Sequence, residues 1–536
     1  MSAHLAELLS AAATQAPDRV ALVEADSGRR VTWAELDGEV DHVARGLNAM
    51  GLVAGYRVVI ALGNRTEFVT SYLGALRAGL VAVPVNPRST TGELVRLAAD
   101  CGARVVVADD ASLATVRQAV AGLGDALVAA DAELRRTRVV PRVVVVGSPT
   151  EPGETAYAEL VTSAGTDVPV AADPERLAVL LYTSGTSGRP RAAMLSHRAL
   201  LANIDQAARI DPPMLTGDDI VFGVLPLFHV YGLNAVLGQV LHRQARLVLA
   251  LGFDMEDSLS VIEDEAVTVL PVAPPVFAYW QAVPDLGERL HHVRLVLSGS
   301  APLSRQLIDV FEQRTGTAVH QGYGLTEAAP VVTSTLHSGR GANGRAKAGS
   351  VGAALPGIEI RLVDEAGGAP EGGDAGEIWI RGANLFSGYW PDGADGPDRE
   401  GWYATGDVGF LDADGDLFLV DRLKELVIVS GFNVYPVEVE EVVEEVDGVA
   451  EAAVIGTPDE KTGEAVVAYV KARPGSTYSE TELETQVREH CSVRLARFKQ
   501  PTEVHVVDEL PHTVTGKVAK GRLRAARRRS NLGLLE

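Results

Sequence analysis

Cysteine is nearly absent from this chain of 536 residues. Only Cys101 and Cys491 are present, and they lie far apart in the sequence. A disulfide framework or a metal site built from cysteines needs more thiols at closer spacing, so the sequence excludes both. This sparse use of cysteine fits a reducing compartment, and we expect the protein to be cytoplasmic.

Positive charge is also in short supply, because the formal net charge is -23 at pH 7. A general nucleic-acid-binding protein needs a cationic face to displace counterions from phosphates, so we expect no nucleic-acid partner. The overall field of such a chain repels anions. Any phosphate site must therefore be local, built from backbone N–H groups and a few placed cations.

We expect neither a signal peptide nor a membrane span in this sequence. Residues 1–20 have no basic region before their apolar part, unlike a secretory signal. Residues 221–241 carry no Asp, Glu, Lys or Arg and are long enough to cross a bilayer. However, Pro226, His229 and Asn234 would need polar partners in lipid, which favours a buried strand and helix lining a pocket. A weak peripheral membrane contact stays open as an alternative.

Fixed-period repeats and long low-complexity tracts are absent, and the composition instead changes along the chain. Residues 30–110 alternate helical patterns with short β-rich runs, which predicts parallel strands between helices. Glycine- and acid-rich turns in residues 364–416 predict an antiparallel, β-rich subdomain. After Leu423 the pattern predicts a compact α+β domain. We therefore expect an α/β fold with a large N-terminal domain of α/β subdomains plus the β-rich subdomain at 1–423, and a small α+β C-terminal domain at 424–536.

A loop rich in hydroxyl groups and glycine follows the strand-like run at 176–181. Its glycines let backbone N–H groups turn inward and its hydroxyls add donors, which suits a polyphosphate. The predicted phosphate-binding residues are Thr183, Ser184, Gly185, Thr186, Ser187 and Gly188. The Gly-Lys-Ser/Thr ending of a Walker A loop is missing. A flexible surface turn is the alternative for such a cluster taken alone.

With the residues that follow this loop, the chain resembles the adenylate-forming superfamily of acyl-CoA synthetases, luciferases and peptide-synthetase adenylation domains, and it looks most like fatty acyl-CoA ligases. Six further ordered motifs carry the resemblance. They are PLFHVYG at 226–232, SGSAPL at 298–303, GYGLTE at 322–327, WYATGD at 402–407, DRLKELVIVSGFNVYPVEVE at 421–440 and LPHTVTGK at 510–517. The resemblance implies a mobile C-terminal lid domain and ATP-dependent ligation of an acid to coenzyme A through an acyl-adenylate.

The resemblance also implies a nucleotide site drawn from several motifs. Besides the phosphate loop, its residues are Arg191, Ser300, Ala301, Pro302, Gly322, Tyr323, Gly324, Thr326, Asp407 and Arg422. Tyr323 offers an aromatic face for adenine, and Asp407 can accept two hydrogen bonds from a ribose diol. Glu327 offers a hard oxygen ligand for Mg²⁺, the expected ion. Without the other motifs, Glu327 would be a solvated charge.

Lys517 completes the implied catalytic set with Glu327 and Thr326. A cation is needed where the substrate carboxylate meets the α-phosphate, because two anions must approach each other there. Alternatively Lys517 is one member of the basic run that follows it, whose later residues we expect on a solvated helix end. Lys424 lies where the superfamily has its hinge, and Gly431 is expected on the loop that meets the pantetheine arm of coenzyme A.

His229 is expected to line the acyl pocket, since the superfamily has an aromatic or histidine residue beside its acyl tunnel. The motif around it holds no carboxylate for a substrate amino group, which disfavours an amino acid. We expect a fatty acid as the substrate. An acyl-AMP ligase that loads an acyl carrier protein and a non-catalytic nucleotide-binding relative are the alternatives.

One departure from the superfamily pattern motivates the non-catalytic alternative. Where the superfamily usually has Pro-Lys-Gly, this chain has Pro190, Arg191 and Ala192. Arg191 replaces a compact ammonium with a planar fork, and Ala192 lacks the conformational freedom of glycine. The departure leaves weaker or slower ATP handling open.

Overall fold

The computed structural model describes the chain except for residues 1–2, 129–138, 163–172, 184–190, 301–302, 304, 339–345, 365, 371–374, 423–424, 426, 430–431, 460–461, 477, 496, 514–515 and 532–536. Some predicted site residues therefore lie outside the described residues, and their roles stay predictions. They are Ser184, Gly185, Thr186, Ser187, Gly188, Ala301, Pro302, Lys424 and Gly431.

The described chain forms two compact units. The first comprises Met1–Glu359 and Arg381–Tyr403, and the second comprises Ile360–Ile380 and Ala404–Glu536. Both units draw on the glycine-rich stretch that the sequence assigns to a β-rich subdomain. The predicted boundary after Leu423 lies outside the described residues and stays a prediction.

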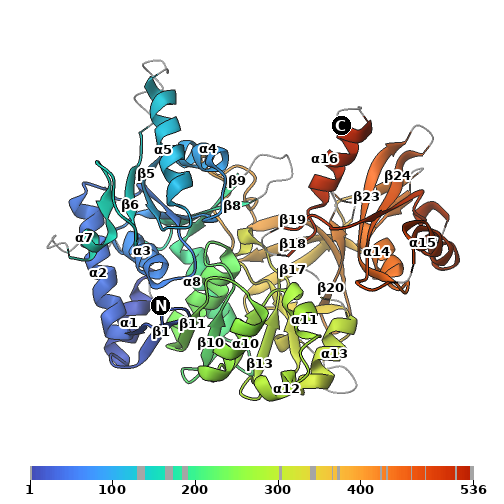
Figure 1. Cartoon of the computed structure of the whole chain (residues 1–536), viewed down its shortest axis with the longest axis horizontal. Coiled ribbons are helices and arrows are strands. Elements are labelled where there is room, and N and C mark those ends of the chain that lie inside the picture. The colour runs from blue at the N-terminus through green and yellow to red at the C-terminus, as the bar shows by residue number, and fades with distance from the viewer. Residues whose placement is uncertain are drawn as a thin grey trace. The chain divides into compact units, whose positions relative to one another are not determined.

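A seven-stranded sheet forms one part of the first unit, in the order β7-β6-β5-β3-β4-β8-β9. Figure 1 labels its strands β5, β6, β8 and β9. Its strands are β3 (Arg57–Ala61), β4 (Val81–Pro84), β5 (Ala103–Ala108), β6 (Arg142–Val145), β7 (Thr155–Ala156), β8 (Leu177–Thr183) and β9 (Arg191–Ser196). Every ladder from β7 to β8 is parallel, whereas β9 runs antiparallel to β8. The predicted alternation of parallel strands and helices is confirmed.

A second seven-stranded sheet of this unit has the order β14-β13-β12-β10-β11-β1-β2. Its strands are β1 (Val20–Glu24), β2 (Arg30–Thr32), β10 (Ile220–Gly223), β11 (Arg246–Leu249), β12 (Val269–Val272), β13 (Leu295–Ser298) and β14 (Val319–Gln321). These ladders are parallel except for the antiparallel pair of β1 and β2. Motifs that follow β13 and β14 therefore meet at one edge of the sheet, where the carboxyl ends of parallel strands gather.

Helices connect the parallel strands, as crossovers between parallel strands require. Besides α9, described below, the α-helices described in the first unit are α1 (Glu7–Gln15), α2 (Trp33–Ala49), α3 (Thr66–Arg77), α4 (Thr91–Cys101), α5 (Leu113–Val128), α7 (Tyr157–Val161), α8 (His197–Ala208), α10 (Met255–Asp264), α11 (Pro274–Trp280), α12 (Leu286–Arg289) and α13 (Arg305–Thr315). Local sequence sets their ends. Helix α4 begins with a capping box between Thr90 and Glu93 and ends at Gly102 with φ 61°.

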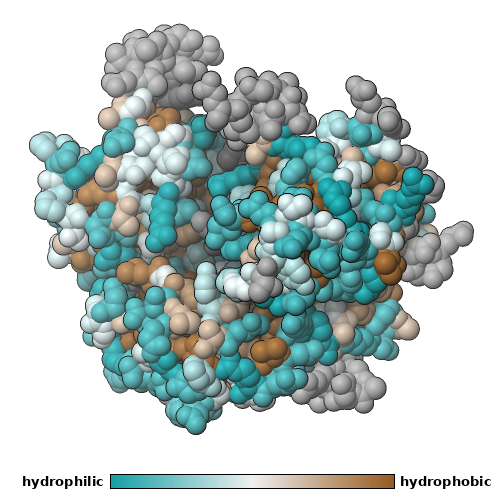
Figure 2. Space-filling model, turned by 45° about the vertical axis from the view of Figure 1, so that its right-hand side comes forward, coloured by the Kyte–Doolittle hydropathy of each residue, from teal (hydrophilic) through white to brown (hydrophobic). Residues whose placement is uncertain are grey.

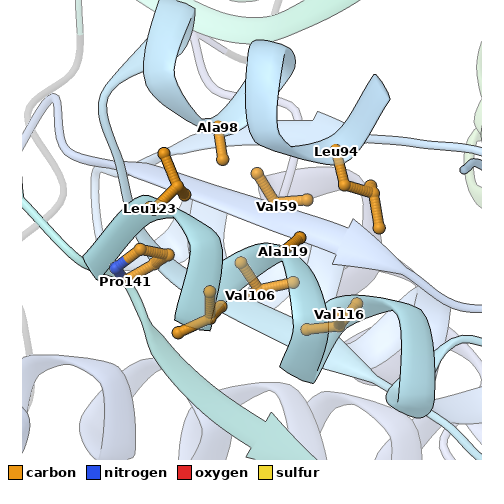
Figure 3. Close-up of a pocket in the computed structure, with 9 residues that line it drawn as sticks. Val59, Leu94, Ala98, Val106, Val116, Ala119, Leu123 and Pro141 are labelled. Carbon is orange, nitrogen blue, oxygen red and sulfur yellow. The ribbon is translucent and has the colours of Figure 1, made fainter. Parts of the chain in front are cut away.

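Helices α4 and α5 pack side by side over the first sheet and leave a small gap in the core. Figure 3 shows Leu94 and Ala98 of α4 and Val116 and Ala119 of α5 around this gap, with Val59 of β3 among them. The cavity has a volume of about 10 Å³, and its lining is almost wholly apolar. A gap this small and apolar stays dry. It is a packing defect of the core and has no room for a substrate.

Residues 221–241 form a strand and a helix, as predicted. Strand β10 is followed by a π-helix, η1 (Tyr231–Gly238), which continues into α9 (Gln239–Arg243). Asn234 is buried, and its amide nitrogen donates to the carbonyls of Leu200 and Ala329. Within the described residues, no helix has both the length and the apolar character to span a membrane. On the face shown in Figure 2, hydrophobic residues lie in small groups among hydrophilic ones.

Antiparallel strands open the second unit, as the glycine-rich turns predict. Strands β17 (Ile358–Val363), β18 (Gly376–Gly382), β19 (Trp402–Leu411) and β20 (Asp416–Arg422) adjoin in the order β20-β19-β18-β17. The β19 and β20 pair is antiparallel. Two shorter strands, β15 (Thr333–Ser334) and β16 (Ser350–Ala354), pair antiparallel within the first unit.

The C-terminal part of the second unit is an α+β domain. Its strands are β21 (Val427–Val429), β22 (Phe432–Val434), β23 (Val449–Asp459), β24 (Gly463–Ala472) and β25 (Glu503–Val507). Its helices are α14 (Pro436–Glu444), α15 (Glu480–Arg494) and α16 (Lys520–Asn531). Valine-rich faces of the strands and of α14 and α15 share one core, which includes Cys491. The predicted compact α+β domain is confirmed.

Candidate active site

The GYGLTE segment follows β14 and runs against the chain's own backbone. A Cβ at Gly324 would lie 2.2 Å from the carbonyl oxygen of Pro330, and one at Gly322 would lie 2.8 Å from that of Thr333. Neither position has room for a side chain. Between them the N–H of Tyr323 donates to the hydroxyl of Thr333 at 3.3 Å. Internal packing thus explains both glycines, and the roles predicted for them and for Tyr323 toward a nucleotide stay predictions.

Glu327 is a buried carboxylate with a defined partner. It lies with Thr326 in a short 3₁₀ turn, η2 (Thr326–Ala328), and is 8% exposed. The hydroxyl of Tyr389 donates to its Oε1 atom at 2.5 Å, and the N–H of Phe386 donates to its backbone carbonyl at 2.9 Å. Glu327 is therefore held in place and is not a solvated surface charge.

Tyr389 is a site residue that the sequence did not reveal. Burial and the adjacent Glu327 carboxylate raise the pKa of its hydroxyl, so Tyr389 remains a hydrogen-bond donor at neutral pH. The ring of Phe386 packs edge-on against it, with ring centres 5.0 Å apart. No sequence motif predicted the contact of Tyr389 with Glu327, because the two residues lie 62 positions apart in the chain.

Arg191 lies at the start of β9 and covers Tyr389. Its guanidinium carbon lies 3.8 Å from the centre of the Tyr389 ring, and its Nη2 atom lies 2.6 Å from Oδ2 of Asp395. Thr183 sits opposite Arg191 in the β8 and β9 ladder, and its hydroxyl donates to the Arg191 carbonyl at 3.4 Å. The structure thus brings the described ends of the predicted phosphate loop together with the Glu327 region.

The SGSAPL segment leaves β13 with an unusual backbone. Ser300 has φ 74°, which is rare for a residue with a side chain and is often found at functional sites. A Cβ at Gly299 would lie 2.9 Å from Cε1 of Tyr231, so this glycine gives room to an aromatic ring. Ser300 was predicted in the nucleotide site, whereas Tyr231 is a neighbour that the sequence did not point out.

His229 lies just before the π-helix, in a tight bend. Its Nδ1 atom accepts the N–H of Tyr231 at 3.3 Å, and its backbone N–H donates to Pro226 at 3.0 Å. A Cβ at Gly232 would lie 2.3 Å from the Pro226 carbonyl oxygen, so the bend needs glycine there. Such π-helical turns are uncommon and often occur at functional sites. The predicted role of His229 in an acyl pocket stays a prediction.

Two predicted nucleotide residues of the second unit are cross-strand neighbours. Asp407 in β19 pairs directly with Arg422 in β20. Asp407 is buried, and its N–H donates to the hydroxyl of Thr405 at 3.1 Å. Gly406 precedes it with φ 75°, a conformation that glycine adopts without strain. The structure therefore places these two residues at one point of one ladder.

Lys517 lies on an exposed turn with a fixed backbone. Its N–H donates to the Thr513 hydroxyl at 3.1 Å, and the Thr513 N–H donates to the Lys517 carbonyl at 2.7 Å. Gly516 turns the chain with φ 81°. The prediction of a solvated helix end beyond this turn is wrong for Lys520 and Arg527. The first is 9% exposed, and both form ion pairs with carboxylates of their own unit.

The residues around Glu327 fit a cation that arrives with a nucleotide. Within the described ranges, no group of three His, Cys, Asp or Glu side chains could hold a metal ion on its own. Mg²⁺ needs no such group, because it is commonly held by one or two carboxylates together with substrate phosphates and water. Glu327, fixed through Oε1, retains Oε2 as an oxygen of the right chemistry.

Comparisons with known proteins show the family of this chain. A family model described as AMP-binding enzyme matches residues 9–390, and one described as AMP-binding enzyme C-terminal domain matches residues 438–517. Similar curated proteins include two from Oryza sativa subsp. japonica. The 4-coumarate–CoA ligase-like 9 is 35% identical over 522 residues, covering 95% of this chain and 90% of the relative. The 4-coumarate–CoA ligase 3 is 33% identical over 515 residues, covering 95% and 89%.

Solved structures of similar proteins share the fold over nearly the whole chain. ATP-bound MatB from Rhodopseudomonas palustris has a TM-score of 0.85 at 31% identity and covers 98% of this chain and 99% of its own. The Mycobacterium tuberculosis fatty acyl CoA synthetase has a TM-score of 0.74 at 31% identity, with the same coverage. The predicted mixed α/β fold and the resemblance to the adenylate-forming superfamily are both confirmed. The chain belongs to the AMP-binding enzymes of that superfamily and is an AMP-forming acyl-CoA ligase.

Proposed function

We propose that this ligase activates a hydrophobic carboxylic acid with ATP to give an acyl-adenylate and then transfers the acyl group to coenzyme A. The buried Glu327 carboxylate, held at 2.5 Å by Tyr389, carries the proposal. A carboxylate kept buried and oriented in this way suits a ligand of ATP-borne Mg²⁺. That ion would offset the charge that builds on the phosphate during attack.

Other residues of this chain are assigned roles in the two steps. The substrate carboxylate attacks the α-phosphorus, and pyrophosphate leaves. We assign Lys517 to stabilising the charge that develops there, and Asp407 to holding the ribose diol. In the second step the thiol of coenzyme A attacks the acyl carbon, and AMP leaves with the electron pair of the broken bond. Gly431 is proposed for the loop that meets the incoming pantetheine arm.

A fatty acid remains our proposed substrate, and an aryl acid is the second candidate. Tyr231, whose ring lies against Gly299, would give the acyl pocket a flat aromatic wall. Of the similar proteins named above, one is a 4-coumarate–CoA ligase, one is a 4-coumarate–CoA ligase-like protein and one is a fatty acyl CoA synthetase. A matched series of fatty acids, 4-coumarate, benzoate and malonate, assayed for CoA thioester formation, decides between the candidates.

The first test of the function is carboxylate-dependent exchange between ATP and pyrophosphate. We expect exchange with at least one hydrophobic acid and, after addition of coenzyme A, stoichiometric AMP and thioester. Exchange without thioester on coenzyme A, but with transfer to an acyl carrier protein, would select the carrier-protein alternative. A folded chain that supports no exchange with any acid would favour the non-catalytic alternative.

A further inference from the structure

Three side chains form a continuous series of contacts that ends on Glu327. Asp395 pairs with Arg191 at 2.6 Å, and the Arg191 guanidinium carbon lies 3.8 Å from the centre of the Tyr389 ring. The Tyr389 hydroxyl in turn donates to Glu327 at 2.5 Å. All four residues belong to the first unit.

The backbone around Tyr389 is fixed to β9, the strand that carries Arg191. Residue Tyr389 bridges to Ala193, and the N–H groups of Trp390 and Met194 donate to the carbonyls of Ala192 and Gly388 at 2.9 and 3.0 Å. These backbone hydrogen bonds fix the position of the Tyr389 ring relative to β9. The ring therefore reaches Glu327 from a supported position.

Arginine suits this position for a physical reason. A planar guanidinium can lie flat on an aromatic ring while its edge pairs with a carboxylate, whereas an ammonium offers neither a flat face nor a fork. Arg191 does both, with Tyr389 under its face and Asp395 at its edge. The arginine that replaces the usual lysine thus makes two contacts, with Tyr389 and with Asp395, for which its planar shape is suited.

We propose that Tyr389 is a positioning residue for Glu327, and that Arg191 and Asp395 hold the Tyr389 ring in place for this purpose. The proposal rests on the assignment of Glu327 to ATP-borne Mg²⁺. It gives Arg191 a role that depends on the shape of its side chain, in addition to the charge predicted to face the phosphates. On this proposal, the replacement of the superfamily's usual lysine by Arg191 supports the site and does not impair it.

Tyr389→Phe tests the hydrogen bond while it keeps the ring. Isothermal titration calorimetry of the full chain with MgATP should show about tenfold weaker binding, since a hydrogen bond to a charged group is lost. The same titration with ATP in EDTA should give equal affinities for the variant and the parent. Equal MgATP affinities, or equal losses with and without Mg²⁺, would overturn the proposal.

Arg191→Lys tests the stacked guanidinium while it keeps the positive charge. We expect about threefold weaker MgATP binding, in line with the loss of a cation–π contact. Arg104 and Tyr56 provide a matched control pair in the same unit, because the Arg104 guanidinium carbon lies 4.5 Å from the Tyr56 ring centre. Tyr56→Phe and Arg104→Lys should leave MgATP binding unchanged. An unchanged affinity in Arg191→Lys would remove Arg191 from the proposal.

A double-variant comparison shows whether Tyr389 acts through Glu327. In a Glu327→Ala background, Tyr389→Phe should weaken MgATP binding no further, whereas a separate structural effect would add its own loss. If Tyr389→Phe does not fold, Arg191→Lys and Asp395→Asn test the same series from its exposed end, and MgATP affinity equal to the parent in both would refute it. These binding results are independent of pyrophosphate exchange, so failure of the proposed reaction is distinguishable from failure of this inference.

Discussion

Lys517 occupies a turn whose shape is set by its neighbours and leaves its side chain exposed. Thr513 closes the turn from both sides, through its hydroxyl and its N–H, and Gly516 supplies the positive φ. The turn fixes where the backbone of Lys517 lies, and its long side chain is exposed. A fixed backbone with a long, exposed side chain suits a cation that stabilises the negative charge developing on the α-phosphate in the transition state.

Lys517→Ala should therefore cripple adenylation and largely spare thioester formation. Loss of one charge-assisted contact to the transition state costs about 3 kcal/mol, or roughly a hundredfold in rate. Pyrophosphate exchange measures the first step, and thioester formation from supplied acyl-AMP measures the second. Lys471→Ala is the control, because Lys471 pairs with Glu509 at the surface of the same unit. Equal loss of both steps in Lys517→Ala would contradict the assignment.

At the scale of single residues, the sequence singled out a candidate residue where the residue and the neighbours that suggest its role lie in one short motif. Glu327 and Asp407 each follow glycine and hydroxyl residues that predict a ligand-facing turn, and both are buried in the structure. Tyr389 and Lys520 were missed because their partners lie far away in the chain, as Glu327 and Glu440 show. Such pairings depend on the fold and leave no local pattern.

Helix α8 begins at one of two adjacent buried histidines that should make stability depend on pH. His197 and His4 have ring centres 3.9 Å apart and are each 3% exposed. Burial lowers the pKa of His4 to about 4, and burial together with the neighbouring His4 lowers the pKa of His197 to about 3. Both rings are therefore neutral in the folded state near neutral pH.

The unfolded chain binds protons at these histidines near pH 6.5, whereas the folded chain does not. The stability they contribute is complete above pH 6.5 and falls as the pH drops toward 4. We expect a loss of about 3 kcal/mol in the free energy of unfolding between pH 7 and 5. Urea unfolding followed by tryptophan fluorescence measures it. In a His4→Gln, His197→Gln double variant the shift of the urea midpoint should shrink, and a shift as large as in the parent would disprove the assignment.

Helix α16 is anchored by a buried lysine. The Nζ atom of Lys520 lies 2.9 Å from Oε1 of Glu440 and 3.3 Å from Oε2 of Glu425. The same Oε1 atom accepts the N–H of Val454 at 2.6 Å. Because Glu440 belongs to α14, this lysine joins two helices of the C-terminal α+β domain.

Lys520→Ala should destabilise the second unit by about 3 kcal/mol, since it leaves two largely buried carboxylates without their shared cation. Differential scanning calorimetry would show the transition of this unit at lower temperature. Arg522→Ala, an exposed position on the same helix, should change the free energy of unfolding by less than about 0.5 kcal/mol. Similar transition temperatures for both variants would mean that Lys520 is no anchor.

At the scale of elements, the alternation of helical and β-rich patterns predicted much of what the structure shows. The alternation in residues 30–110 and the strand and helix in residues 221–241 are both present. The π-helical form of η1 could not be predicted from the sequence. Over so short a segment, the spacing of hydrophobic residues does not distinguish a π-helix from an α-helix. Where this helix begins, Gly232 lies close to the carbonyl oxygen of Pro226.

For the whole molecule, the proposed site residues are divided between the two units. Glu327 and Arg191 belong to the first, whereas Asp407, Arg422 and Lys517 belong to the second. In the proposed reaction, Lys517 first acts at phosphorus, and a thiol afterwards attacks the acyl carbon. We therefore propose that the C-terminal domain changes its arrangement between the two steps, as lid domains of many enzymes do.

Lys424 is the residue at which we propose this change, because the superfamily has its hinge at this position. A few backbone dihedrals can absorb a large rotation. Proline fixes its own φ near -65° and also restricts the preceding residue, so Lys424→Pro should trap one arrangement. We expect this variant to keep carboxylate-dependent pyrophosphate exchange and to lose most CoA thioester formation.

Lys424→Ala is the matched control, since the hinge needs rotation and not the ammonium group. It should retain both half-reactions at rates close to those of the parent. Circular dichroism and thermal melting would establish that the proline variant is folded, so that a loss of thioester formation reports on rotation alone. Thioester formation at the parent rate in Lys424→Pro, or loss of both half-reactions in the folded variant, would rule out rotation at this residue as the step that separates adenylation from thiol transfer.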